Sequence, residues 1–261
     1  MIDIHHHLLF GIDDGPKDIL SSIEQAKAAA ADGITHIACT PHANHVFAFR
    51  PEINQERLAA IREQLGDQLT LGLGCDFHLS YENIEDALNH PRKYTINQGQ
   101  YLLVEFADYV IPTTIGNAFH ELMSRGMQPI ITHPERNLLL QRDFERMAAW
   151  IRAGCLVQVT AASLGRRFGK RAYTVAWDLL ERNWVHFVAT DAHNMNGRRP
   201  CMSEAFQAIE KRLGEETAQR LCVENPLAAF ENRDLPAQPE PEGIEEDALA
   251  KRGFLSRLFG R

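Results

Sequence analysis

The chain begins Met-Ile-Asp-Ile-His-His-His at residues 1–7, a short apolar segment that ends in three consecutive histidines. Residues 1–5 have the composition of a β-strand. On extended backbone, His5 and His7 point to the same side, and His6 points to the other. The first expected strand therefore ends in a pair of potential metal ligands.

Working outward from this segment, short apolar runs alternate with helical stretches along most of the chain. The expected strands are residues 1–5, 34–39, 69–75, 101–106, 128–132, 155–160 and 185–190. The expected helices include residues 19–31, 55–64, 115–125, 144–152 and 173–182. Alternating strands and helices predict a parallel sheet, and about seven such units favour a closed or nearly closed α/β barrel. A doubly wound open sheet is the structural alternative.

Residues with metal-ligand side chains follow or end six of the expected strands. They are His5 and His7, His42, Asp76, Glu105, His133, and the pair Asp191 and His193. Because the carboxyl ends of parallel strands open on one face of a barrel, we expect these side chains to converge there. Imidazole and carboxylate groups are the ligand set for Zn²⁺, Mn²⁺ or Fe. The sequence therefore predicts a metal-dependent active site at the strand C-terminal face.

Composition excludes several other classes of protein. The formal net charge of −8 argues against a general affinity for nucleic acid. The N-terminus has no signal-like stretch, so we expect a cytoplasmic protein. The five cysteines are scattered without a C-x-x-C pair, which is typical of reduced thiols. Neither a Cys-x5-Arg loop, a G-x-S-x-G elbow nor a Walker loop is present, which disfavours those routes to phosphate chemistry.

The composition changes near residue 235, which divides the chain into three expected parts. Residues 1–235 would form the barrel, and residues 236–250 an acidic Pro- and Glu-rich linker without fixed structure. Residues 251–261 form a basic tail with four large apolar side chains at helical spacing. Such a tail could contact the inner face of an anionic membrane or a membrane-bound partner. The alternative is a disordered end with incidental apolar residues.

The motifs at the strand ends resemble those of the PHP (polymerase and histidinol phosphatase) superfamily, whose members are distorted (β/α)7 TIM-like barrels. Within it, the chain is most similar to the CpsB/CapC-like tyrosine phosphatases of bacterial capsule and exopolysaccharide loci. The resemblance extends from residue 1 to about residue 230. The matching pieces are Met-Ile-Asp-Ile-His-His-His (1–7), Asp-Asp-Gly-Pro (13–16), Thr-Pro-His (40–42), Gly-Cys-Asp (74–76), Val-Glu-Phe (104–106), Thr-His-Pro-Glu-Arg (132–136) and Thr-Asp-Ala-His-Asn-Met-Asn-Gly-Arg (190–198).

The resemblance implies three divalent metal ions, Mn²⁺ in the first instance, with Fe or Zn as alternatives. It assigns His5, His7, Asp76 and Asp191 to the first ion, Asp76, Glu105 and His133 to the second, and Asp14, His42 and His193 to the third. The sequence leaves open whether Asp13 or Asp14 is the ligand. The family usually has glutamate where this chain has Asp76, so a shorter carboxylate must bridge.

The same resemblance assigns substrate binding and activity. Arg136 and Arg198 match arginines that bind the substrate phosphate. The implied reaction is hydrolysis of phosphotyrosine by metal-activated hydroxide, on a membrane-associated tyrosine kinase that controls polysaccharide export. The first alternative is a phosphatase for small phosphomonoesters such as histidinol phosphate. The second is a catalytically inactive binding module.

Overall fold

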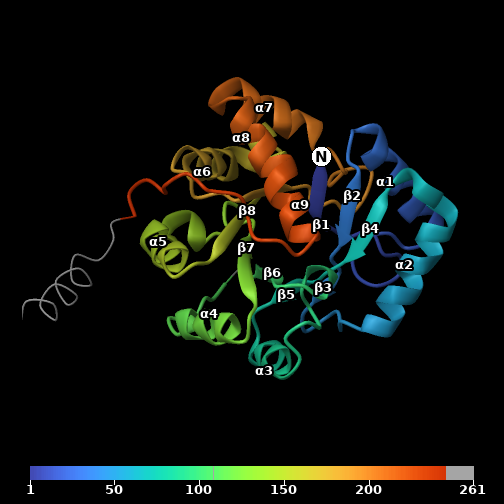
Figure 1. The fold of residues 1–261 in the computed structure, drawn as a ribbon, viewed down its shortest axis with the longest axis horizontal. Coiled ribbons are helices and arrows are strands. Elements are labelled where there is room, and N and C mark those ends of the chain that lie inside the picture. Colours follow the sequence, from blue (N-terminus) through green and yellow to red (C-terminus); the bar gives the residue numbers. More distant parts are fainter. Residues whose placement is uncertain (108, 245–261) are drawn as a thin grey trace, which may run out of the picture.

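The computed structural model describes residues 1–107 and 109–244, in which short strands alternate with helices around a central layer of strands (Figure 1). The strands are β1 (Ile2–His6), β2 (His36–Cys39), β3 (His42–Ala43), β4 (Thr70–Leu73), β5 (Asp76–His78), β6 (Tyr101–Glu105), β7 (Gln128–Thr132), β8 (Leu156–Thr160) and β9 (Phe187–Ala189). The α-helices are α1 (Ile19–Ala31), α2 (Pro51–Leu65), α3 (Tyr81–Asn89), α4 (Ile115–Ser124), α5 (Phe144–Arg152), α6 (Gly169–Glu181), α7 (Ser203–Leu213), α8 (Glu215–Gln219) and α9 (Asn225–Phe230). Short helical turns complete the described part: η1 (Gly66–Gln68), η2 (Ile96–Gln98), η3 (Leu140–Arg142), η4 (Ala161–Gly165) and η5 (Arg220–Glu224).

The described strands form two parallel sheets. One has the order β1-β2-β4, and the other has the order β3-β5-β6-β7-β8-β9. The strands β2 and β3 are separated only by Thr40 and Pro41, and β4 and β5 only by Gly74 and Cys75. Beyond β9, the backbone N–H of Asp191 donates to the carbonyl of His5 at 2.8 Å, and a single bridge joins His6 to Ala192. The sheets therefore meet at both edges without forming one closed sheet.

Local chemistry explains why the sheets are interrupted. Pro41 has no N–H to donate to a ladder, so β2 cannot continue through it. Gly74 lies where the chain passes close to its neighbours, because an added Cβ would come within 3.1 Å of the Thr40 side chain. The sequence-based expectation of an α/β protein with parallel strands is thus confirmed. The expected closed TIM-like barrel is not found as a closed sheet.

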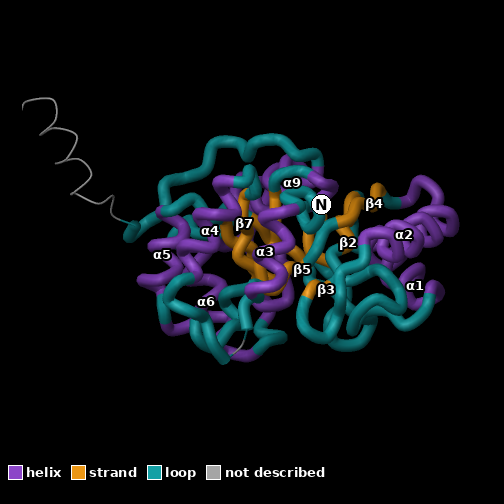
Figure 2. Tube along the Cα trace, turned by 90° about the horizontal axis from the view of Figure 1, so that it is seen from below, coloured by secondary structure: helices purple, strands orange, loops and turns teal. Residues whose placement is uncertain are grey.

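The helices cover the outside of the strands. In Figure 2, α1 and α2 lie on the side of β2 and β4, whereas α4, α5 and α6 lie on the side of β7. One of the two buried apolar clusters includes alternate residues of single strands, such as Ile2 and Ile4 of β1. Because alternate residues of a strand share one face, this cluster fills the interior. Phe230 of α9 belongs to it and contacts the ring of His36 at the start of β2, so α9 covers the end where the strands begin.

All seven expected strands and the five expected helices are found. The short strands β3 and β5, which follow β2 and β4 after a break, lie beyond the expected ranges. The sequence pattern did not indicate α3 or the helices from α7 to α9. Among the described residues, no helix combines the length and apolarity that a bilayer crossing requires.

Residues 236–244, expected to belong to an unstructured linker, instead contact the body of the protein. The indole N–H of Trp184 donates to the carbonyl of Glu242 at 2.9 Å, and Gln238 exchanges hydrogen bonds with Asn225. The expectation of disorder is therefore wrong for this part. The rest of the linker and the basic tail, residues 245–261, lie outside the described residues.

Candidate metal centre

The nine side chains expected to bind metal lie together at the end where the strands finish. They form four overlapping groups, in each of which the potential ligand atoms lie within 4.8 Å of one another. The groups are His5, His7 and Asp76; His5, His133 and Asp191; His42, Asp76 and Glu105; and His7, Asp14, His42 and His193. Residues from positions 5 to 193 converge because most of them follow or end a parallel strand, and parallel strands finish on one face.

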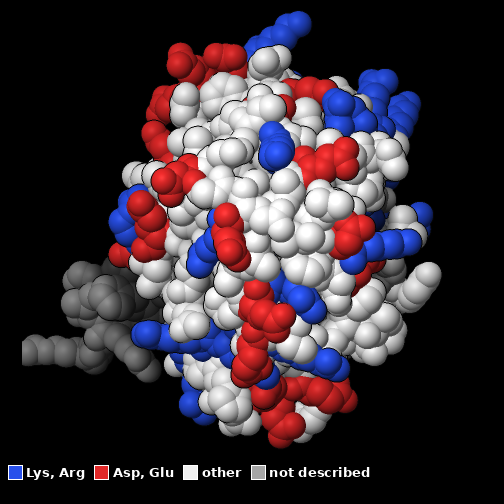
Figure 3. All heavy atoms as spheres, turned by 90° about the vertical axis from the view of Figure 1, so that its right-hand side faces the viewer, with Lys and Arg blue, Asp and Glu red and all other residues white. Residues whose placement is uncertain are grey.

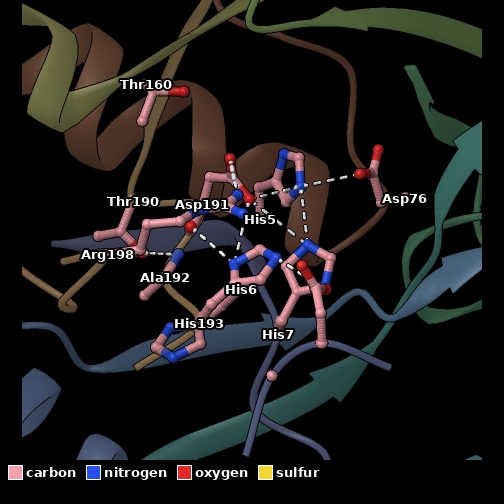
Figure 4. Close-up of polar contacts among 12 residues, drawn as sticks. His5, His6, His7, Asp76, Thr160, Thr190, Asp191, Ala192, His193 and Arg198 are labelled. Carbon is pink, nitrogen blue, oxygen red and sulfur yellow. Dashed lines mark hydrogen bonds and ion pairs between the residues drawn. The ribbon is translucent and has the colours of Figure 1, made fainter. Parts of the chain in front are cut away.

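The buried group around His5 contains the residues expected at the first metal. The Nε2 of His5 lies 3.5 Å from Asp76 Oδ2 and 3.4 Å from Asp191 Oδ1. The Nε2 of His7 also lies 3.4 Å from Asp191 Oδ1. Figure 4 shows His5 placed between the two carboxylates of Asp76 and Asp191. His5, His7 and Asp76 would hold a cation here, and Asp191 lies close to the same two imidazoles.

The group expected at the third metal is also present. The Oδ1 of Asp14 lies 3.2 Å from His193 Nε2 and 3.4 Å from His42 Nε2. Asp13 occupies a different place: its Oδ2 accepts from His7 Nδ1 at 2.7 Å and from the backbone N–H of His42 at 3.1 Å. Of the two neighbouring aspartates, Asp14 therefore faces the cluster, and Asp13 supports two of its histidines.

The residues expected at the second metal are arranged less simply. Asp76 and Glu105 form a group with His42, whereas His133 groups with His5 and Asp191. The Nε2 of His133 lies 3.7 Å from Glu105 Oε1, close enough for a cation to bridge the pair. His42 therefore takes part in two groups.

Hydrogen bonds from outside the cluster fix which imidazole nitrogen faces inward. The Nδ1 of His5 lies 3.0 Å from the side-chain oxygen of Gln158, and that of His7 is held by Asp13. The Nδ1 of His193 lies 3.0 Å from the carbonyl of Asp191. In each case Nε2 is left for a metal, the usual arrangement around ligating histidines. Sequence reasoning missed Gln158, whose one signal is a polar residue within an otherwise apolar strand.

His6 points away from the cluster, as expected, and joins a buried network. Its Nδ1 lies 3.0 Å from Asp3 Oδ2, and its Nε2 lies 3.4 Å from the side-chain oxygen of Gln25. Gln25 in turn donates to the carbonyl of His193 at 2.9 Å. Asp3 also accepts from the backbone N–H of Thr190 at 3.0 Å. The network therefore ties β1 and α1 to the segment that carries Asp191 and His193.

Two proposed ligands have left-handed backbone, with φ 34° at His133 and φ 51° at Asp191. Such conformations cost on the order of 1–3 kcal/mol for residues other than glycine and concentrate at functional sites. His133 directly follows β7, and Asp191 is the second residue after β9. The left-handed backbone therefore occurs where each strand ends and the side chain enters the cluster.

Buried polar atoms without hydrogen-bond partners provide the test of whether a metal fits here. They include both carboxylate oxygens of Asp76, Oδ1 of Asp191, Nδ1 of His42 and Nε2 of His193. Buried polar atoms of this kind are costly unless something satisfies them. All of these atoms face the cluster groups described above, so the residues present fit bound cations.

The carboxylates of the cluster raise the pKa of two of its histidines, His5 and His42. Burial alone would lower the pKa of His5, yet the carboxylates of Asp191 and Asp76 raise it to about 9. The pKa of His42 is raised to about 11 against the same effect of burial, through Asp14 and Asp76. Burial and the neighbouring Asp76 raise the pKa of Glu105 to about 8. Burial instead holds the pKa of His133 well below its usual value and lowers that of His193 to about 4, which favours the neutral imidazole that binds metal.

Both arginines expected to bind phosphate lie at the edge of the cluster. Arg136 and Arg198 each form an ion pair with Oδ2 of Asp191, whose other oxygen faces the histidines. A pocket next to Arg136 is lined by Glu105, Phe106, Thr132, His133 and Asn137 as well. The two guanidinium groups are therefore close enough to reach an anion bound at the cluster.

The parallel strands and the nine convergent side chains define an α/β protein with a histidine–carboxylate metal centre. Residues 1–231 match the family described as capsular polysaccharide synthesis, CpsB/CapC. This chain belongs to the CpsB/CapC family.

Comparisons with individual proteins agree with this assignment. The tyrosine-protein phosphatase YwqE of Bacillus subtilis is 33% identical over 253 residues, which cover 95% of this chain and 98% of YwqE. The tyrosine-protein phosphatase CpsB of Streptococcus pneumoniae is 32% identical over 239 residues, or 87% of this chain and 96% of CpsB. A crystal structure from work on YwqE and CpsB, described as unique metal-dependent tyrosine phosphatases, matches with a TM-score of 0.87 at 31% identity. That match covers 94% of this chain and all of the other.

Proposed function

We propose that this chain is a metal-dependent protein-tyrosine phosphatase. The observation that carries the proposal is the cluster of nine histidines and carboxylates, with unpartnered buried atoms facing one another and two arginines at its edge. The similarity to YwqE and CpsB, both named tyrosine-protein phosphatases, supports the same activity.

Three divalent ions, Mn²⁺ in the first instance, are proposed to occupy the site. Asp76 and Asp191, with His5 and His7, would hold the first, and Asp76, Glu105 and His133 the second. Asp14, His42 and His193 would hold the third. When bound, such ions supply Lewis acidity, which lowers the pKa of water and stabilises negative charge on phosphate.

The protein's own groups would position the substrate. The guanidinium groups of Arg136 and Arg198 would donate paired hydrogen bonds to the phosphate oxygens, for which their planar geometry is suited. Gln158 and Asp13 would keep His5 and His7 in the orientation described above. The two sheets would act together as one distorted seven-stranded barrel formed by residues 1–235, with the site at its strand C-terminal face.

The proposed natural substrate is a phosphotyrosine on a membrane-associated kinase of polysaccharide export. Phosphate release should be measured on a phosphotyrosine peptide and on histidinol phosphate with the same metal-loaded protein. Preference for the peptide by at least about tenfold in kcat/KM, a difference of about 1.4 kcal/mol, is expected. Preference for histidinol phosphate would instead favour a small-molecule phosphatase.

Replacing the five cysteines by alanine or serine is expected to lower stability without abolishing the reaction. Four of them are buried, and burial raises the pKa of Cys39, Cys155 and Cys222 to about 12. A protonated, buried thiol is a poor nucleophile. Thermal unfolding and phosphate release should be measured on the same variant. A folded, metal-loaded variant with no activity would contradict the proposal.

Deleting residues 251–261 is expected to leave hydrolysis of a small phosphotyrosine compound unchanged. The segment combines Lys and Arg with Phe254, Leu255, Leu258 and Phe259, so its loss should weaken binding to anionic vesicles or to the substrate kinase. Vesicle co-sedimentation and kinase pull-down would measure this. Equal binding by the truncated and full-length proteins would show that the tail has no targeting role.

A further inference from the structure

A run of positive charge lies beside the metal centre in this otherwise acidic chain. Arg166 and Arg167 lie in the turn between η4 and α6, and Lys170 and Arg171 lie in the first turn of α6. Arg199 lies in the segment between β9 and α7. All five residues are exposed. The sequence has no aspartate or glutamate between Glu145 and Asp178, nor between Asp191 and Glu204. These five residues are called the cationic strip below.

The cationic strip lies next to Arg136, which is proposed to bind the substrate phosphate. Within the turn, Phe168 packs against Arg136, whose guanidinium carbon lies 4.3 Å from the centre of the ring. The Nη1 of Arg136 also lies 3.4 Å from Oγ1 of Thr160, the last residue of β8 before η4. A substrate whose phosphate contacts Arg136 would therefore pass directly over this turn.

Little of the positive charge is neutralised by the protein itself. Glu204 lies 2.5 Å from Arg199 and 3.9 Å from Arg167, so one carboxylate serves two guanidinium groups. Arg166 stacks on the ring of Tyr173 instead, and Arg171 donates to the carbonyl of Gln141 at 2.5 Å. Among the described ion pairs, Glu204 is therefore the one acidic partner of the strip, and it contacts two of the five cations.

The start of α6 adds to the local positive potential. This helix has no capping side-chain hydrogen bond and no acidic residue in its first turn, where Lys170 and Arg171 lie. Cations are disfavoured at a helix N-terminus because the helix dipole is positive there. On the α1 and α2 side of the molecule, acidic and basic side chains are instead interspersed (Figure 3). The strip is thus locally unfavourable for the free protein, a condition that a bound anionic partner would relieve.

We propose that the cationic strip binds an acidic polypeptide segment next to the phosphotyrosine of the substrate protein. This inference rests on the proposed function and specifies its substrate class. A phosphotyrosine side chain alone would reach the pocket at Arg136, whereas only flanking residues would extend to Arg166 and Lys170. Complementary charge of this kind raises association rates and selects partners more than it changes the chemical step.

The test compares three substrates on the metal-loaded full-length protein: a phosphotyrosine peptide with acidic flanks, the same peptide with neutral flanks, and p-nitrophenyl phosphate. The strip variant combines Arg166→Asn, Arg167→Gln and Lys170→Gln. Asparagine is used at residue 166 because its backbone is left-handed, with φ 64°. The matched control, Lys27→Gln with Arg125→Gln and Lys211→Gln, removes the same charge from exposed positions in the second half of α1 and at the C-terminal ends of α4 and α7.

The wild-type protein is expected to prefer the acidic peptide over the neutral one, and the strip variant to lose about tenfold in kcat/KM on the acidic peptide alone. The loss should appear mainly in KM and shrink as salt is raised, because screening weakens exposed charges. The control triple should remain within about twofold of wild type on all three substrates, as expected for exposed charges that make little net contribution.

Two results would overturn the inference while leaving the phosphatase proposal intact. One is equal turnover of acidic and neutral peptides by wild type. The other is a strip variant that keeps peptide kinetics but loses binding to anionic vesicles, which would assign the strip to a lipid surface. If the wild-type protein hydrolyses none of the three substrates, the proposed function itself fails.

Discussion

The Asp76→Asn variant is expected to release phosphate more than about 100-fold more slowly than wild type. Replacing a residue that only hydrogen-bonds to a metal ligand already lowers activity by about 10–100-fold, and Asp76 is proposed to be a ligand itself. Asp76 is fully buried, and its Oδ2 lies 3.1 Å from His42 Nδ1 and 3.5 Å from His5 Nε2. Although burial disfavours the charged form, His5 and His42 keep the pKa of Asp76 well below its usual value. Asparagine keeps the shape but removes the charge that would bridge two cations.

Metal content and turnover should be measured together on this variant. Elemental analysis is expected to find fewer bound ions than in wild type, with the fold retained by circular dichroism. The matched control is Asp76→Glu, which keeps the carboxylate on a side chain longer by one methylene and should keep substantial activity. An Asp76→Asn protein with full metal content and wild-type turnover would remove Asp76 from the centre.

Arg136→Ala and Arg198→Ala are each expected to lower kcat/KM by on the order of 100-fold, about 3 kcal/mol, while metal content stays nearly unchanged. Both guanidinium groups contact the outer oxygen of Asp191, so they lie beside the cluster without belonging to its ligand set. The loss should be similar for peptide and p-nitrophenyl phosphate, since both substrates present the same phosphate.

A lysine replacement separates charge from geometry at these positions. Arg136→Lys and Arg198→Lys keep the positive charge but lose the planar fork, so they should recover only part of the lost rate. Wild-type rates in both alanine variants would mean that the phosphate binds elsewhere.

The sequence predicted which side chains would lie together, because all of them except Asp14 follow or end an expected strand. His42 and Asp191 each follow an apolar run, which is a local signal of a strand end. Parallel strands bring such positions together on one face. The choice between Asp13 and Asp14 could not be made in this way. The two residues are adjacent in the sequence, and only the folded loop turns Asp14 towards His193 and Asp13 towards His7.

Features that depend on contacts between distant segments were harder to predict. The break of β2 at Pro41 and of β4 at Gly74 separates the sheets, although the periodicity on each side is that of one strand. Residues 236–244 have the composition of an unstructured linker. Their position is fixed by Trp184 and Asn225, which no local pattern reveals. The supporting role of Gln158 likewise appears only in the folded structure, where its side-chain oxygen lies 3.0 Å from His5 Nδ1.

Phosphate release from a phosphotyrosine peptide as a function of metal content tests the central claim most directly. Protein stripped with chelator and verified metal-free by elemental analysis should show no turnover above background. Adding Mn²⁺ back should restore activity in proportion to the ions bound, saturating near three per chain if the proposed ligand sets are correct. Full turnover by verified metal-free protein would contradict the account.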